Sequence, residues 1–372
     1  MVRPLRQTSP VTASATLFMT IPVNISVDAM GADSGPSIAV DGVEAIFERR
    51  PDTKARFLLH GDEAVLGPLV AAKASQVRDA IEIRHSATEV RMTDKPSEAV
   101  RRSRGSSMWN AISSVKEGEA AVVVSAGNTG ALMAISKVVL RMKKGVHRPA
   151  IAASWPTVRG HTVVLDVGAN VECSAAQLVE FAIMGEAYHR AVHGSTNPTV
   201  GLLNVGQEEL KGNDTVREAA ALIQAAHLKL NYYGFVEGDD ISMGVTDVVV
   251  TDGFSGNIAL KTAEGAVKLV AAWMRESFSN SLSAKLGAAL LSISGIKELK
   301  TRLDPRSING GVLLGLNGMV VKSHGGTDGQ GFATALGIGI DLAPSNFLSE
   351  IEGNLDRLAK AEEIEAAKEP AE

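Results

Sequence analysis

Five short segments of the chain combine glycine with small polar residues, and each follows an apolar run. They comprise residues 28–33 (DAMGAD), 125–130 (SAGNTG), 166–170 (DVGAN), 204–206 (NVG) and 251–257 (TDGFSGN). Glycine lets backbone N–H groups point toward a ligand, and the first turn of a following helix adds partial positive charge. Such segments are typical of sites that bind small anions.

The sequence lacks the motifs that bind nucleotides and dinucleotides. No G-x-x-x-x-G-K-[ST] occurs, and no G-x-G-x-x-G follows an apolar run with an acid about 20 residues later. The G-x-S-x-G turn of serine hydrolases is also missing. We therefore expect the anion to be a small phosphate, and we predict no cofactor.

Two residues in or just after these segments could bind an anion or stabilise a developing negative charge. Lys211, in KGN at 211–213, follows an apolar run and precedes a helix, so it could seat a phosphate; it could equally be a solvated loop lysine. Asn257, in GFSGN, could donate its amide to a developing oxyanion, and the same position suits a helix N-cap.

Further residues in these segments are candidates for phosphate or substrate binding. A turn with a helix cap explains residues 127–130 almost as well as an anion cradle does. We expect Asp28, Asp166 and Asp252 to orient a lysine or an amide, or to cap a helix, rather than to bind Mg²⁺. His324 could carry a proton, although a hydrogen-bonded loop histidine is the favoured interpretation. The predicted set is Asp28, Gly31, Ser125, Gly127, Asn128, Thr129, Gly130, Asp166, Asn170, Asn213, Asp252, Gly256, Lys261 and His324.

The apolar runs before these segments predict the fold. They are Asn24–Val27, Ala120–Val124, Thr162–Leu165, Thr199–Leu203 and Asp247–Val250. Continuous Val/Ile/Leu runs indicate strands covered by helices on both faces. We predict an α/β fold, a doubly wound, mainly parallel sheet in an α/β/α sandwich. Because the carboxyl ends of parallel strands share one edge, all five segments should meet in one crevice.

Composition excludes several classes of protein. The 372 residues carry a net charge of −5, 4% aromatic residues and a single cysteine. This gives no electrostatic footprint for nucleic acid, and neither a disulfide framework nor a cysteine-rich metal site. No apolar run reaches the roughly 18 residues of a membrane-spanning helix. We expect a cytoplasmic enzyme without a bound metal.

The two ends differ from the remainder in composition. Residues 1–22 are rich in Ser and Thr and have no acid, which predicts a disordered extension, or a start codon assigned too early with Met19 as the true start. Residues 351–372 are predominantly acidic and predict a solvated helix that frays. Residues 23–350 then form a single domain, with a helical protrusion at about 267–303.

Eight motifs in chain order resemble the bacterial phosphate acyltransferase (PlsX) family. They are DAMGAD (28–33), DKPSEAVRRSRGSSM (94–108), SAGNTGAL (125–132), LDVGAN (165–170), GLLNVGQEELKGN (201–213), GFVEGDD (234–240), DVVVTDGFSGNIALKTAEG (247–265) and GGVLLGLNGMVVKSHG (310–325). One departure is Ala32, where the family pattern has glycine, so this position must avoid a positive φ or accept strain.

The resemblance implies reversible transfer of a fatty acyl group from acyl carrier protein to inorganic phosphate. The acyl phosphate would then serve a membrane acyltransferase in phospholipid synthesis. The resemblance also implies a homodimer without metal or organic cofactor, a fold similar to phosphotransacetylases and the isocitrate-dehydrogenase group, and catalytic roles for Lys211 and Asn257.

Phosphate is already nucleophilic at neutral pH, so alignment and oxyanion stabilisation can supply much of the rate. Cys173 lies just after the third glycine segment, where a helix start could lower its pKa and permit an acyl-cysteine intermediate. No histidine in that segment could activate the thiol. We therefore expect a structural cysteine and direct attack by phosphate.

Two surfaces could meet partners. An acidic acyl carrier protein needs a basic dock, and the densest basic residues are Arg101, Arg102, Arg104, Lys137, Arg141, Lys143 and Lys144. Solvated helix faces are the alternative explanation. Leu282, Leu286, Ala289, Leu290 and Ile293 recur at helical spacing in a basic segment. This stripe could contact lipid as a peripheral anchor, or form core or a dimer interface.

Two other functions remain open from the sequence. A phosphotransacetylase would use acyl-CoA instead of the carrier protein. A non-catalytic scaffold on the membrane would need the 282–293 stripe, but would tolerate replacement of Lys211 and Asn257.

Overall fold

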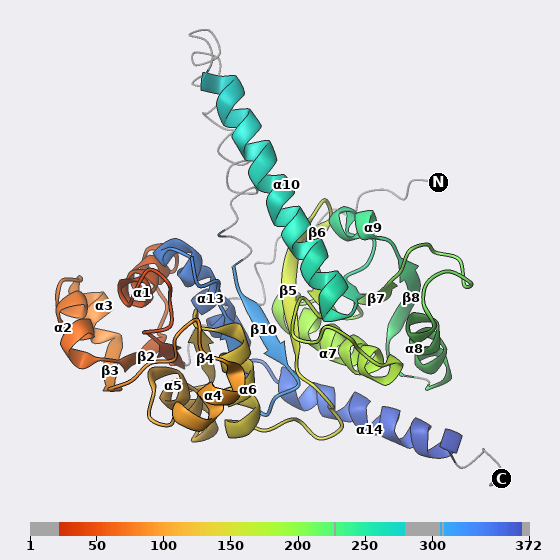
Figure 1. Ribbon diagram of the computed structural model, residues 1–372, viewed down its shortest axis with the longest axis horizontal. Coiled ribbons are helices and arrows are strands. Elements are labelled where there is room, and N and C mark those ends of the chain that lie inside the picture. The colour runs from red at the N-terminus through yellow and green to blue at the C-terminus, as the bar shows by residue number, and fades with distance from the viewer. Residues whose placement is uncertain (1–21, 227, 280–305, 307–308, 367–372) are drawn as a thin grey trace.

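The computed structural model describes residues 22–226, 228–279, 306 and 309–366 (Figure 1). Its strands are β1 (Asn24–Asp28), β2 (Arg56–Gly61), β3 (Ile81–His85), β4 (Val122–Ser125), β5 (Ala150–Thr157), β6 (Gly160–Leu165), β7 (Thr199–Leu203), β8 (Asn231–Val236), β9 (Val248–Val250), β10 (Gly311–Leu314) and β11 (Met319–Lys322). They form one sheet of eleven strands, in the order β3-β2-β1-β4-β11-β10-β5-β6-β9-β7-β8.

Helices connect most of these strands. They are α1 (Ser37–Arg49), α2 (Glu63–Ala71), α3 (Ser75–Asp79), α4 (Pro96–Arg102), α5 (Ser107–Lys116), α6 (Thr129–Val139), α7 (Ala175–His193), α8 (Asp214–Ala225), α9 (Gly238–Met243), α10 (Gly253–Ser279), α13 (Gly329–Leu342) and α14 (Phe347–Ala366).

Helices cover both faces of the sheet, as predicted. Alternate side chains of one strand enter opposite cores: Val122 and Val124 pack with α1, α7 and α13, whereas Val123 packs with α5 and α6. Because both faces are covered, the central strands are continuous apolar runs. Most strand pairs are parallel, so the predicted α/β class is confirmed.

The strand directions correct the expectation of a single edge. β10 is antiparallel to both β11 and β5, and β5 is antiparallel to β6. The block β3-β2-β1-β4-β11 therefore runs opposite to the block β6-β9-β7-β8. The loops after β1, β4 and β11 therefore leave in the opposite direction from those after β6, β7 and β9. The two blocks are staggered, because Lys322, Gly311, Ala153 and Val164 lie in one row of the sheet, so the two sets of strand ends are about one residue apart in height. The five glycine segments thus form two groups.

The C-terminal segment differs from the predicted solvated tail. α14 packs on α7, and its residues Ile351, Leu355 and Leu358 are at most 5% exposed. Glu352 pairs with the buried Lys143 at 2.6 Å. The boundary placed at residue 350 therefore falls inside a packed helix, because apolar residues at helical spacing sit among the acids.

Other boundary predictions fall partly outside the described residues. This applies to residues 1–21, including Met19, and to 280–303, which hold the whole 282–293 stripe. The described part of the protrusion is the second half of α10, which extends away from the sheet (Figure 1). Among the described helices, none is long and apolar enough to cross a membrane.

Candidate active site

The loop after β1 is organised by a buried carboxylate. Asp28 is 3% exposed and accepts hydrogen bonds from the hydroxyls of Ser107 and Ser125, each at 2.7 Å. Burial raises the pKa of Asp28, and the two serine bonds oppose the rise. The next loop lies against it, since a Cβ added at Gly31 would be 2.7 Å from the Cα of Gly127. Only glycine permits this approach of two loop backbones.

The loop after β4 continues into α6 through a helix cap. The Asn128 side-chain oxygen accepts from the N–H of Ala131 at 3.0 Å. Its amide donates to the carbonyls of Met92 and Asp94 at 2.8 and 2.9 Å. Asn128 therefore uses both ends of its side chain to hold loops together, while the neighbouring Thr129 is exposed.

His324, the second residue after β11, contacts α10. The Nε2 of His324 lies 3.5 Å from the carboxylate of Glu264, which also pairs with Lys261 at 2.8 Å. Burial lowers the pKa of His324, and the nearby charges of Lys261 and Lys322 lower it further. The third turn of α10 thus brings Lys261 close to the loop after β11.

After the oppositely directed strand β6, Asp166 organises the loop. It is fully buried, and its two oxygens accept the N–H groups of Ile151, Gly168, Ala169 and Asn170 and the side-chain amide of Asn170, at 2.7–3.1 Å. Burial raises its pKa, and these bonds act against the rise. Since Asn170 also donates to the carbonyl of Pro149 at 2.8 Å, both side chains are occupied by the loop itself.

The start of α10 rests directly on this loop. Asp252 caps the helix by accepting the N–H of Ser255 at 2.7 Å. A Cβ at Gly256 would lie 2.0 Å from the carbonyl oxygen of Asp166, so this position excludes any side chain. Asn257 follows at the surface and lies against Gly168. Its side chain makes no hydrogen bond within the described part of the chain.

Lys211 lies on the loop between β7 and α8. Its carbonyl accepts the side-chain amide of Asn204 at 3.1 Å, and Gly212 follows with a φ of 85°. Asn213 caps α8 through the N–H of Val216 at 2.9 Å. The Lys211 side chain is exposed and forms no ion pair with any described residue. Because β7 and β9 are neighbours, Lys211 and Asn257 share one edge.

The predicted site residues therefore form two groups. The edge of β6, β9 and β7 carries Asp166, Asn170, Lys211, Asn213, Asp252, Gly256 and Asn257. The edge of β1, β4 and β11 carries Asp28, Gly31, Ser125, Gly127, Asn128, Thr129, Gly130 and His324. α10 connects them, because Lys261 lies one helical turn after Asn257 and reaches the surroundings of His324. Their roles in binding stay predictions.

Ser107, Glu264 and Lys322 belong to these groups but were absent from the predicted set. Each lies in a motif that resembled the family, yet no local pattern marks it. Ala32, the departure from the family pattern, has no positive φ; among the described residues Arg141 is the single non-glycine residue that does.

Cys173 is half-buried below the loop of Asp166. Loss of water around the thiol, with the nearby charge of Asp166, raises the pKa of Cys173 to about 11. The thiol is therefore protonated at neutral pH, which makes it a poor nucleophile.

Two histidines on α7, His189 and His193, have a spacing that also occurs in zinc sites. Their rings instead lie 4.8 Å apart, and His161 stacks on His193 at 5.0 Å. Burial lowers the pKa of His193 to about 3. No group of three or more His, Cys, Asp or Glu in the described ranges could hold a metal ion.

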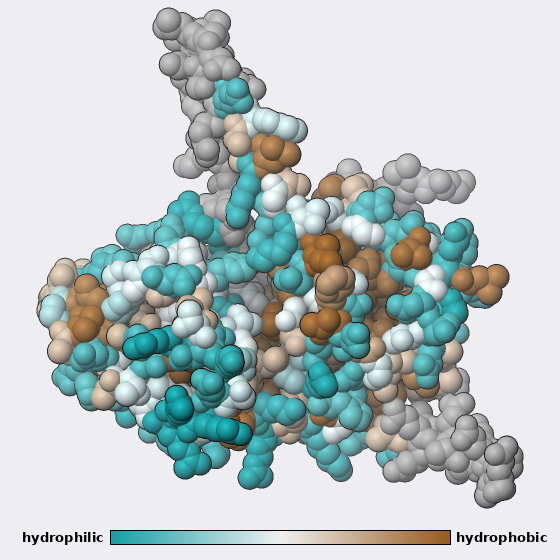
Figure 2. Space-filling model, viewed as in Figure 1, coloured by the Kyte–Doolittle hydropathy of each residue, from teal (hydrophilic) through white to brown (hydrophobic). Residues whose placement is uncertain are grey.

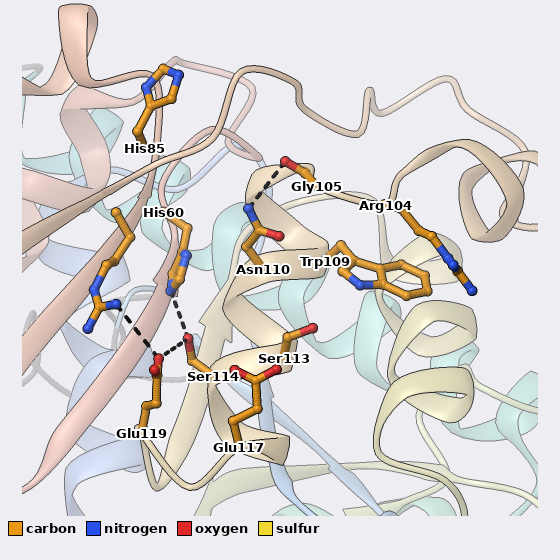
Figure 3. Close-up of a pocket in the computed structure, with 11 residues that line it drawn as sticks. His60, His85, Arg104, Gly105, Trp109, Asn110, Ser113, Ser114, Glu117 and Glu119 are labelled. Atoms are coloured by element: carbon orange, nitrogen blue, oxygen red, sulfur yellow. Dashed lines mark hydrogen bonds and ion pairs between the residues drawn. The ribbon is translucent and has the colours of Figure 1, made fainter.

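The predicted basic dock is mostly exposed, with one correction. Lys143 is 5% exposed and paired with Glu352, so it is not free to meet a partner. Arg104 lies over the ring of Trp109 at 5.7 Å. Both line a polar cavity of about 500 Å³ between β2, β3 and α5, which contains none of the predicted catalytic residues (Figure 3).

Exposed apolar side chains surround Lys211 and Asn257. Leu210 is 92% exposed, Val205 76% and Val171 70%. Phe254 and Ile258, on the first turns of α10, are 59% and 49% exposed. Apolar surface gathers around the beginning of α10 in Figure 2. A long apolar ligand would therefore find a surface beside the predicted catalytic pair.

The fold is that of the phosphotransacetylase group. The structure of EutD phosphotransacetylase from Staphylococcus aureus matches with a TM-score of 0.56 at 16% identity, covering 88% of this chain and 96% of that one. A phosphotransacetylase from Streptococcus pyogenes matches with a TM-score of 0.59, also at 16% identity, over 88% and 95%. At this identity the likeness concerns the fold alone.

The sequence defines the family more closely. The family described as "Fatty acid synthesis protein" matches residues 23–350. The phosphate acyltransferase of Maricaulis maris is 66% identical over 349 residues, covering 94% of this chain and 99% of that protein. That of Paramagnetospirillum magneticum is 52% identical over 344 residues, covering 92% and 97%. The chain belongs to this family of phosphate acyltransferases, and it is an acyltransferase.

Proposed function

We propose that this enzyme moves a fatty acyl group reversibly from the thioester of acyl carrier protein to inorganic phosphate. The observation that supports this most directly is the pairing of Lys211 with Asn257. Lys211 lies on the loop after β7, and Asn257 lies near the start of α10, which follows the neighbouring strand β9. Both are exposed, and neither side chain has a partner within the described residues. A free cation and a free amide donor at one edge are what phosphate attack on a thioester requires.

Each residue has a distinct role in this proposal. Lys211 seats the attacking phosphate as a point charge. Asn257 donates its amide to the oxyanion that develops on the thioester carbonyl, which is worth about 3–4 kcal/mol for a well-aimed donor. The buried carboxylates Asp28 and Asp166 hold the loops in place and do not touch phosphate.

Phosphate attacks directly, without an acyl-enzyme intermediate. The protonated Cys173 thiol supports this, because a thiol with a pKa of about 11 supplies little thiolate at neutral pH. The exposed apolar side chains beside Asn257 would receive the acyl chain. The exposed basic residues other than Lys143 would meet the acidic carrier protein, in a cytoplasmic homodimer that touches the membrane peripherally and passes acyl phosphate to a membrane acyltransferase.

The test is acyl-phosphate formation from palmitoyl-acyl carrier protein and phosphate, with palmitoyl-CoA as a parallel donor. The wild type, Lys211→Ala, Asn257→Ala and Cys173→Ala are compared. We expect turnover with the carrier protein, at least a hundredfold loss in the first two variants and retention in the third, from the size of a lost oxyanion donor.

Other outcomes assign other functions. Turnover with palmitoyl-CoA alone would indicate a phosphotransacetylase reaction, which the shared fold also permits. Full activity in both Lys211→Ala and Asn257→Ala would contradict the proposal that these residues form the catalytic site.

A further inference from the structure

Lys322 ends β11 between two glycine loops. Its ammonium donates to the carbonyl of Ala126 at 3.2 Å and to the carbonyl of Ser323. Ala126 directly precedes Gly127, the residue that contacts the loop after β1. An ammonium has three N–H donors, so one remains unused within the described part of the chain.

Neighbouring carboxylates do not take this remaining donor. Asp28 and Asp33 attract Lys322 electrostatically, but neither forms an ion pair with it. Both oxygens of Asp28 are already held by Ser107 and Ser125. Burial away from water lowers the pKa of Lys322 to about 8, although Asp28 and Asp33 act in the opposite direction. The nearby carboxylates therefore do not fully offset the loss of hydration of the ammonium group. An added anion would supply the missing compensation.

Further positive groups converge on the same place from α10. Lys261, Lys322 and Lys268 all lower the pKa of His324 through their charges. The carboxylate that pairs with groups of this cluster is Glu264, which lies 2.8 Å from Lys261 and 3.5 Å from His324. Asp28 and Asp33 act on Lys322 from the other side, but both oxygens of Asp28 already accept serine hydroxyls.

We propose that Lys322, Lys261 and His324 form a second phosphate-binding site, beside the carboxyl ends of β1, β4 and β11 and separate from Lys211 and Asn257. It would take the oxyanion of inorganic phosphate or of a phosphate ester. This inference rests on the proposed function, whose reaction contains two such groups. One is the free phosphate acceptor, and the other is the phosphate ester of the pantetheine arm that carries the acyl thioester.

The position of α10 supports two separate sites. Asn257 and Lys261 are one turn apart, about 6 Å along the helix axis. The first belongs to the edge of Lys211 and the second to the edge of Lys322. Two anions on either side of this turn would be held near each other without sharing a lysine.

The experiment measures phosphate binding by calorimetric titration in the absence of acyl donor. The first site is removed by Lys211→Ala, and the second is then tested by adding Lys322→Met. Lys73→Met in the same background is the matched control, because Lys73 is a partly buried lysine whose ammonium pairs at 2.7 Å with Asp41 and Glu44 rather than with these loops. Circular dichroism and a Lys211→Ala/Lys322→Arg variant check that the fold is retained.

We expect Lys211→Ala to keep phosphate binding and the Lys322→Met double variant to lose at least tenfold in affinity. The Lys73→Met control should bind as its parent does, and the arginine variant should retain part of the affinity. Equal affinity of Lys211→Ala and Lys211→Ala/Lys322→Met would overturn the proposal, as would loss of all binding in Lys211→Ala alone.

The same titration with 4′-phosphopantetheine and with pantetheine separates the two phosphate sources. Tighter binding of phosphopantetheine than of inorganic phosphate, lost with Lys322→Met, assigns the site to the carrier arm. The opposite order assigns it to the acceptor. Since no turnover is needed, failure of the acyltransferase assay and failure of this proposal are seen separately.

Discussion

At the scale of single residues, the acidic groups and the groups proposed to bind phosphate have different roles. Asp28 and Asp166 are buried and fully bonded to neighbouring hydroxyls and N–H groups, so they shape the loops. Lys211 and Asn257 remain exposed and unbonded within the described residues. Phosphate meets cations and amides in such an arrangement, while the carboxylates that would repel it are turned into the protein.

The lowered pKa of Lys322 makes a prediction for stability. Its pKa in the folded protein is about 8, below its usual value, so the unfolded chain binds more protons between these two values. The contribution of this lysine to the free energy of unfolding therefore rises with pH above about 8, by about 1–2 kcal/mol. Below about pH 8, the buried charge of Lys322 lowers the free energy of unfolding by a constant amount.

Urea unfolding of the wild type and Lys322→Met at about pH 7.5 and about pH 9.5 tests this sign. The wild type should gain free energy of unfolding relative to the variant at the higher pH. A difference that stays constant, or that falls, would contradict the assigned pKa.

At the scale of elements, α10 is the helix that joins the two loop groups. Its first turn is anchored by the close approach of Gly256 to Asp166 and of Gly253 to Asn170, whose carbonyl accepts the Gly253 N–H at 2.7 Å. Its third turn carries Lys261. The position of the helix therefore decides the spacing of the groups that meet substrate.

Gly256→Ala should displace this helix, because the new Cβ would meet the Asp166 carbonyl oxygen at 2.0 Å. We expect a loss of about 2 kcal/mol or more in the free energy of unfolding, together with reduced turnover. Gly265→Ala in the same helix is the control: a Cβ there meets nothing within 4 Å, and stability should rise by up to about 1 kcal/mol. Equal behaviour of both variants would argue against the anchoring contact.

Phe254 and Ile258 lie one turn apart on α10 and flank Asn257. If they receive the acyl chain, Ile258→Ser should raise KM severalfold for palmitoyl donors and much less for butyryl donors, since each buried CH₂ contributes about 0.8 kcal/mol. Val158→Ser, at a site 67% exposed on the β5–β6 turn, is the control. Equal effects on both chain lengths would assign the surface to another contact.

At the scale of the whole molecule, α14 closes one face of the sheet. Ile351, Leu355 and Leu358 join the core shared by α1, α7 and α13. Removing residues 351–372 should lower the free energy of unfolding by about 5 kcal/mol or more, at about 1.5–3 kcal/mol for each buried aliphatic side chain.

A chain that ends at residue 360 keeps these three side chains and should unfold like the wild type in thermal or urea denaturation. Similar stability of the two truncated proteins would show that α14 contributes little to the core.

The sequence by itself determined five of the eleven strands (β1, β4, β6, β7 and β9), the glycine loops after them, and Lys211 and Asn257 as candidates. These depend on local chemistry, since apolar runs form buried strands and glycine permits close turns. Only the tertiary structure decided the strand directions, because β10 and β5 reverse the sheet by pairing residues far apart in the chain. For the same reason no local pattern could place Lys322 beside Asp28, bury Lys143 against Glu352, or attach the predicted site residues to two oppositely directed blocks of strands.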